Sequence, residues 1–84
     1  MTKKQVIKLC KIYQEHFSDS GIEPIKEGKK SGRILNHLMW MTIEIPKLVE
    51  EDKMEKVFRW LGFLQGALWA NGAFTLEELK NHNR

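Results

Sequence analysis

The sequence predicts an all-α protein, and three observations lead to this prediction. Apolar residues recur at helical spacing in several segments, and residues that favour turns separate these segments. No segment alternates between apolar and polar residues, as a half-buried strand would. We expect three main helices packed as a bundle and a short fourth helix near the C-terminus, all within one domain that spans residues 1–84.

The composition is that of an ordinary soluble globular protein with a small core. Of the 84 residues, 42% are hydrophobic and 30% are charged. The formal net charge of +3 permits attraction to nucleic acid or acidic proteins, but the 11 acidic residues are interspersed among the 14 basic ones. Cys10 is the only cysteine, so we interpret it as a small buried hydrophobic residue.

The first helix is predicted to begin after Thr2, because Gln5 three residues later completes a capping box. It ends near Ser18–Gly21, where residues that favour turns cluster, and residues 22–30 are interpreted as a loop. The lysines of its early turns are interpreted as a solvated face. Its buried stripe has helical spacing and consists of Val6, Cys10, Tyr13 and Phe17, with Leu9 beside them.

The second helix is predicted to begin at Ser31 and to run to about Ile45. Pro46 lacks an N–H group, so we expect a kink or break there, with residues 47–51 forming a last turn or a corner. The predicted buried stripe of this helix consists of Ile34, Leu38, Met41, Ile45 and Leu48.

The third helix, residues 54–70, is apolar on nearly every side. Asp52 is expected to cap it, with Glu55 reaching back to complete a capping box. A helix that is hydrophobic all round must be buried all round. We therefore expect this helix to be central in the fold, and we expect a second copy of the chain to cover what the other helices leave exposed. The simplest assembly on this basis is a two-fold homodimer.

Small residues recur every four positions along one side of the third helix, at Gly62, Gly66 and Ala70. Glycine costs up to about 1 kcal/mol relative to alanine inside a helix, so its presence there needs a reason. We expect close helix packing or an oligomer contact at this face. Asn71-Gly72 then ends the helix, and a capping box of Thr75 and Glu78 predicts the short fourth helix.

The sequence shows no pattern typical of an enzyme or of a metal or cofactor site. The histidines His16, His37 and His82 are too scattered for a zinc motif, and no glycine-rich loop precedes a helix. Helix capping accounts for the clusters of acidic residues. The N-terminal residues lack the apolar core of a signal peptide, and no apolar run approaches the ~20 residues of a membrane span, so we expect a cytoplasmic protein.

Two groups of side chains are candidates for binding a partner. Positions 33, 37, 40 and 44 recur at helical spacing and lie on one side of the second helix. The same residues are equally compatible with a solvated surface on which the tryptophan packs against a neighbour. The third helix offers two secondary candidates, and the sequence leaves open whether Trp40, Trp60 and Trp69 are core residues or face a ligand. The primary candidates are Arg33, His37, Trp40 and Glu44, and the secondary ones are Arg59 and Gln65.

The second half of the chain resembles a group of short accessory proteins of tailed bacteriophages. The resemblance covers roughly residues 33–84, and it implies a small helical non-enzyme that acts by binding a host component or a defence signal. No activity is assigned to the group, so the resemblance implies no functional residues. The motifs that carry it are His37-Leu38-x-Trp40-Met41, Arg59-Trp60-Leu61-Gly62-Phe63-x-Gln65-Gly66-x-Leu68-Trp69 and Thr75-Leu76-x-Glu78-Leu79.

The leading hypothesis is a phage accessory protein that binds a host protein stoichiometrically, as an agent of host takeover or an inhibitor of defence, in the host cytoplasm. The alternative is an oligomeric sponge that sequesters a nucleotide signal. Here Arg33, His37 and Arg59 would hold phosphate, and Trp40 would stack on the base. A DNA-binding module ranks lower, because the second helix lacks the basic and amide side chains of a recognition helix.

Overall fold

The computed structural model describes residues 1–26 and 34–84, and it confirms the all-α prediction. No strand occurs in these two ranges. The predicted start of the second helix at Ser31 lies outside the described residues. The four helices are α1 (Lys3–Asp19), α2 (Ile34–Glu50), α3 (Met54–Ala70) and α4 (Leu76–His82).

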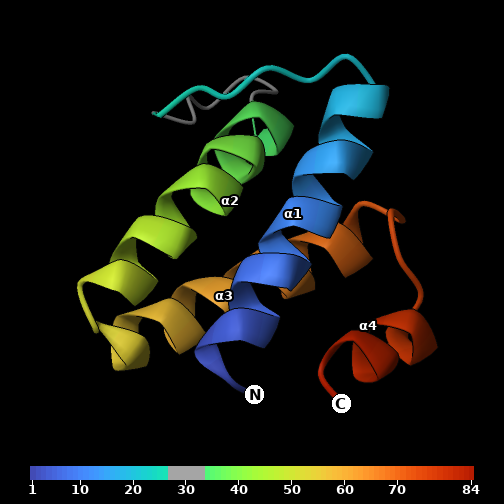
Figure 1. Cartoon of the computed structure of the whole chain (residues 1–84). Coiled ribbons are helices and arrows are strands. Elements are labelled where there is room, and N and C mark those ends of the chain that lie inside the picture. Colours follow the sequence, from blue (N-terminus) through green and yellow to red (C-terminus); the bar gives the residue numbers. More distant parts are fainter. Residues whose placement is uncertain (27–33) are drawn as a thin grey trace.

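Helices α1 and α2 lie side by side and run in opposite directions, and α3 crosses behind them (Figure 1). The short helix α4 packs near the far end of α3, so that both chain termini lie at the same end of the molecule (Figure 1). Helices that follow each other along the chain are therefore neighbours in space. None of the described helices combines the length and apolar character needed to cross a membrane.

Helix α1 matches its prediction closely. The N–H of Gln5 donates to the Thr2 side chain at 3.1 Å, and the Gln5 side chain accepts from the Thr2 N–H at 2.7 Å. This capping box satisfies backbone donors that the first turn would otherwise leave without partners. The whole predicted stripe is buried, namely Val6, Leu9, Cys10, Tyr13 and Phe17. Burial raises the pKa of the Cys10 thiol to about 12, consistent with a core residue.

Three helices end in the same hydrogen-bonded turn, in which one residue adopts a left-handed backbone conformation. Gly21 and Gly72 occupy this position after α1 and α3, each with a φ of 73°. After α2 the position belongs to Asp52, with a φ of 58°. The diagnostic bonds run from Ile22 N to Phe17 O, from Lys53 N to Leu48 O and from Ala73 N to Leu68 O.

The prediction that Asp52 caps α3 is therefore wrong. An N-cap residue has an extended backbone, whereas Asp52 is left-handed because it ends α2. Lys53 becomes the N-cap of α3 and makes no hydrogen bond through its side chain. The Asp52 carboxylate instead accepts from Lys3 at 2.6 Å, and this hydrogen bond lowers the pKa of Asp52.

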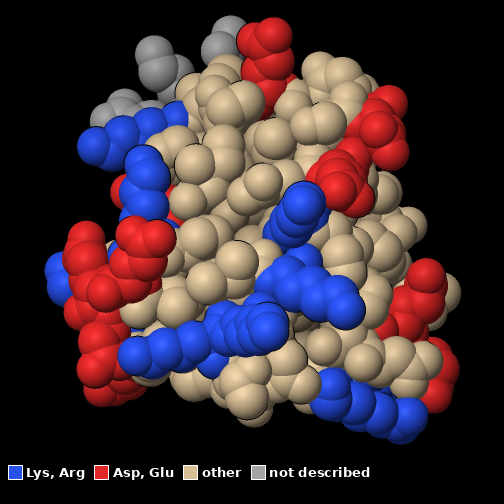
Figure 2. Space-filling model, viewed as in Figure 1, with Lys and Arg blue, Asp and Glu red and all other residues tan. Residues whose placement is uncertain are grey.

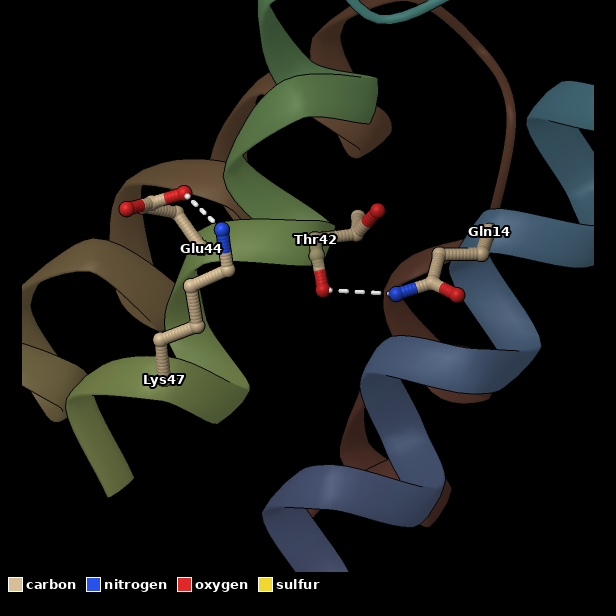
Figure 3. A network of polar contacts seen from close by, with 4 residues as sticks. All are labelled: Gln14, Thr42, Glu44 and Lys47. Carbon is tan, nitrogen blue, oxygen red and sulfur yellow. Dashed lines mark hydrogen bonds and ion pairs between the residues drawn. The ribbon is translucent and has the colours of Figure 1, made fainter. Parts of the chain in front are cut away.

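Pro46 does not break α2, which continues through it to Glu50. A proline removes the N–H that would bond to the carbonyl four residues earlier, here that of Thr42. Thr42 is fully buried, so its carbonyl needs another donor. Gln14 on α1 supplies it, with Nε2 donating to the Thr42 carbonyl at 2.8 Å (Figure 3). Most of the predicted α2 stripe is buried, but Ile34 is 41% exposed.

Helix α3 is buried on one face only. Its predicted stripe of Val57, Leu61, Leu64 and Leu68 faces the core, together with Gln65. In contrast, Phe58, Phe63 and Trp69 are 44%, 55% and 56% exposed. A single chain therefore does not bury this helix all round, contrary to the expectation of a central helix covered by the others.

The small residues of α3 lie on its exposed side. A Cβ atom added to Gly62 or Gly66 would meet nothing within 4 Å, and Ala70 is also exposed. Close packing of another helix of the same chain at this face, one of the two expectations from the sequence, is therefore wrong. The other expectation, a contact with a second copy, concerns atoms outside a single chain and stays a prediction.

Candidate binding cleft

A cleft of about 440 Å³ lies between α2 and α3. Most of its lining surface is apolar, and among the described residues that line it the charged ones are all basic. This combination of aromatic walls with cationic groups is what a partner carrying an apolar anchor and a negative charge would need. The lining residues are Lys26, His37, Trp40, Met41, Arg59, Trp60 and Phe63.

Helix α2 supplies one wall of the cleft through His37, Trp40 and Met41. These positions follow the three- and four-residue spacing that places side chains on one side of a helix. Met41 faces the core, and Trp40 is half-buried and packs against the core, so its ring is both a packing element and a surface. The rings of His37 and Trp40 are stacked, with centroids 5.4 Å apart and planes inclined by 25°.

The segment between α1 and α2 brings Lys26 to the same cleft. Asn36 fastens this segment to the start of α2, because its carbonyl accepts from the Ile25 N–H at 3.0 Å and its amide donates to the Glu23 carbonyl at 2.9 Å. His37 Nδ1 then lies 2.6 Å from the Lys26 carbonyl. A carbonyl only accepts, so Nδ1 of His37 carries a proton, and in the neutral ring Nε2 is an acceptor.

Helix α3 supplies the opposite wall through Arg59, Trp60 and Phe63. The Trp60 ring has two close neighbours: the Trp40 ring, with centroids 5.8 Å apart, and the ammonium of Lys56, 5.2 Å from the Trp60 centroid. The second distance is within the range of a cation–π contact. Arg59 is only loosely paired with Glu55, at 3.8 Å, and its side chain is 67% exposed. The guanidinium is therefore accessible to a partner.

The structure brings three of the predicted candidates together and separates others. His37 and Trp40 from the primary group and Arg59 from the secondary group line the same cleft. Glu44 does not line it, and its carboxylate lies 3.5 Å from Lys47 Nζ farther along α2 (Figure 3). Arg33 lies outside the described residues.

Gln65 is held inside the fold and does not line this cleft. Its Nε2 donates to the Tyr13 hydroxyl at 3.0 Å and to Asn83 Oδ1 at 2.8 Å, and its Oε1 accepts from Asn83 Nδ2 at 3.1 Å. Tyr13 completes the network with His82 Nδ1 at 2.9 Å. Burial raises the pKa of Tyr13 to about 12. Gln65 thus links α1, α3 and the end of the chain, a structural role that accounts for its place in an apolar helix.

Sequence reasoning did not assign Lys26, Met41 or Phe63 to a binding surface, and it left open whether Trp60 is a core residue or faces a ligand. Trp60 and Phe63 carried a usable signal, since they lie one and four positions after Arg59 and share its side of the helix. Trp60 packs partly against the core, whereas Trp69 is 56% exposed and lies away from the cleft. Lys26 carried no local signal, because its place depends on how the connecting segment folds back onto α2.

Other surfaces of the described residues are less organised for binding. The face that carries α1 shows basic side chains across its middle and acidic side chains mainly towards its edges (Figure 2). The exposed lysines of α1 are Lys3, Lys4, Lys8 and Lys11. Within residues 1–26 and 34–84, no group of three His, Cys, Asp or Glu side chains is placed to hold a metal ion.

No family model, no curated protein and no solved structure matches the chain.

Proposed function

We propose that this chain is a non-enzymatic binding protein that acts stoichiometrically on a protein partner through the α2–α3 cleft. The observation that carries the proposal is the cleft itself, with tryptophan rings and a phenylalanine as walls and Lys26 and Arg59 as its charged groups. Tryptophan and arginine are enriched among residues that dominate protein interfaces. Among the cleft residues within 1–26 and 34–84 there is no nucleophile paired with a base, which favours binding over catalysis.

The chemistry of the cleft defines the partner's docking segment. An aromatic or aliphatic side chain of the partner would pack against Trp40, Trp60 and Phe63 in the cleft, and a neighbouring carboxylate would meet Lys26 and Arg59. In line with the resemblance stated above, we further propose that the partner is a host protein and that the chain is a phage accessory factor working as a homo-oligomer in the host cytoplasm.

A nucleotide sponge is the second candidate, and the stacked pair of His37 and Trp40 is the observation that favours it. A base could extend this stack while Lys26 and Arg59 bind the phosphates. We rank it below protein binding because the phosphates of a nucleotide would depend on these two cations, whereas a protein segment would also bind through its apolar anchor; the Arg59 side chain is 67% exposed and Lys26 is also exposed. Exposed cations attract phosphate only weakly, since water and salt screen them.

The test compares affinity purifications of the tagged protein from bacterial host cells, using the parent chain, two charge reversals in the cleft and one control. The cleft variants are Lys26→Glu and Arg59→Glu, on opposite sides of the cleft. The matched control is the charge reversal Lys11→Glu on α1, since all three positions are exposed. We expect the parent and the control to retain the same host protein at a one-to-one ratio of chains, and each cleft variant to lose it.

Native mass spectrometry of the purified parent separates the two candidates, because a bound nucleotide adds a small phosphorylated mass. Equal recovery of the host protein by the parent and both cleft variants would show that binding occurs elsewhere. Absence of both a host protein and a nucleotide on the parent would refute both candidates.

A further inference from the structure

The exposed side of α3 lacks the charges that solvated helix faces carry. From Trp60 to Leu76 the sequence contains no charged residue, although charged residues make up 30% of the whole chain. Within this stretch, Phe63, Trp69 and Leu76 are 55%, 56% and 57% exposed. Contiguous exposed apolar surface of this kind marks an interaction site rather than a free surface.

The exposed face of α3 has a shallow trough bordered by two ridges of side chains. Gly62, Gly66 and Ala70 form its floor, where added Cβ atoms at the two glycines would meet nothing within 4 Å. At helical spacing, Phe63 stands on one side of this floor, and Phe58 and Trp69 stand on the other. A surface with ridges and a trough of helix width is complementary to a copy of itself, because the ridge of one helix fits the trough of the other.

The exposed area is sufficient for a small dimer. A large aromatic side chain buries about 150–250 Å² when covered, so each half-exposed ring or leucine on this face offers on the order of 100 Å². With Met1, which is 42% exposed and lies beside Phe58 and Gly62, the face offers roughly 500–600 Å² per copy. This is near the lower end of the areas that specific dimers bury, which predicts dissociation in the micromolar range.

The charges at the N-terminal end of α3 favour an antiparallel arrangement. Glu55, Lys56 and Arg59 lie in the first turns, and the rest of the helix is uncharged. A parallel pair would place each Arg59 near its own copy. An antiparallel pair instead places Arg59 against the uncharged C-terminal half of the other helix, where a tryptophan ring offers a cation–π contact.

We propose that two copies of the chain pair through the exposed faces of α3, antiparallel and around a two-fold axis near Gly66. The proposal gives a face and an arrangement to the homo-oligomer proposed above, and it does not depend on any ligand of the cleft. Arg59 and Phe63 belong both to this face and to the cleft. The partner subunit's Trp69 therefore lies beside them and extends the outer wall of the cleft, so that each cleft is completed by the second copy.

The test measures the mass of the particle by sedimentation velocity across micromolar concentrations. Gly66→Glu and Trp69→Glu place carboxylates on the proposed interface, and Ser18→Glu on the exposed side of α1 is the matched control. The added side chain at position 66 has open space in the single chain, so the fold is expected to persist, with an unchanged circular-dichroism spectrum. We expect a dimer for the parent and the control, and a rise of ~100-fold or more in the dissociation constant for both interface variants.

Disulfide capture tests the orientation, and Cys10 does not interfere because it is buried. In an antiparallel pair, Gly66→Cys should form a linked dimer in oxidising buffer and Glu55→Cys should not, since the two copies of residue 55 lie at opposite ends of the pair. A linked Glu55→Cys dimer would overturn the antiparallel arrangement.

A monomeric parent at all concentrations, or a dimer that tolerates both glutamates, would overturn the interface. If the dimer fails while Lys26→Glu still loses the host protein, the cleft function stands without the dimer, because Lys26 does not lie on α3.

Discussion

Replacing Gln14 by leucine should destabilise the fold, although Gln14 is only half-buried on α1. Its amide is the donor for the Thr42 carbonyl, at 2.8 Å, and Thr42 is fully buried. The variant loses this hydrogen bond and leaves a buried acceptor without a partner, which costs about 1–3 kcal/mol of the free energy of unfolding. In a domain of this size, each kcal/mol lowers the melting temperature by about 4–8 °C.

A double-mutant cycle with Pro46→Ala isolates this cause. Alanine at position 46 restores the backbone N–H that a helix normally donates to the carbonyl four residues earlier. The Thr42 carbonyl then has a donor within α2, so Gln14→Leu should cost less than half as much in this background as in the parent. The assay is urea denaturation of the parent, both single variants and the double variant, followed by circular dichroism.

The reasoning fails if Gln14→Leu lowers the free energy of unfolding equally in both backgrounds. Equal costs would mean that Gln14 stabilises the fold by packing, independently of the carbonyl that Pro46 leaves open. Gln14→Ser is a useful companion variant, because its side chain is too short to reach α2 and it adds no apolar surface. It should show the same dependence on residue 46.

Four further predictions follow from the core and the helix ends. Tyr13, the only tyrosine, should ionise at a pH of about 12 in a spectrophotometric titration, and a midpoint near 10 in folded protein would contradict its burial. The stability that its neutral hydroxyl contributes should be present below its ordinary pKa of 10.0 and should be lost as the pH rises towards 12. The Cys10 thiol, whose pKa burial raises to about 12, should react with a disulfide reagent only after the protein is unfolded. The hydrogen bond from the Thr75 N–H lowers the pKa of Glu78, so the stability that the Glu78 carboxylate contributes should be present above its ordinary pKa of 4.5 and lost as the pH falls below it. In thermal melts between about pH 5 and pH 3, the Glu78→Gln variant should therefore lose less stability than the parent. The free energy of unfolding of Asp52→Val should be about 1–2 kcal/mol lower than that of Asp52→Gly, because both variants lose the contact with Lys3 but only valine opposes the left-handed backbone. Equal stability of the two variants would argue against a left-handed backbone at this position.

The features that the sequence predicts correctly are those set by neighbours in the chain. The capping boxes at Thr2 and Thr75 and the buried stripe of α1 depend on residues within a few positions of each other. The error at Asp52 arises because two helices compete for one short connection. The same residue type suits the end of α2 and the start of α3, and only the backbone geometry shows which use prevails.

The features that the sequence does not predict depend on residues far apart. The partner that lets α2 pass through Pro46 lies 28 positions away from Thr42, on another helix. The cleft combines three segments, and the place of Lys26 follows from hydrogen bonds to Asn36 and His37 rather than from its own neighbours. The sequence identifies Trp40 and Arg59 as candidates, but only the packing of α2 against α3 places them together.

The hydrogen bond between His37 and Lys26 decides which kind of hydrogen bond the imidazole ring can offer to a partner. Because Nδ1 donates to the Lys26 carbonyl, this proton is already used within the chain. In the neutral ring, Nε2 is the nitrogen left to contact a partner, and it accepts a hydrogen bond. A partner segment that places an N–H or O–H group there would gain a hydrogen bond, whereas one that places a carbonyl there would find no donor. The cleft would thus distinguish partner segments of the same size by the direction of a single hydrogen bond.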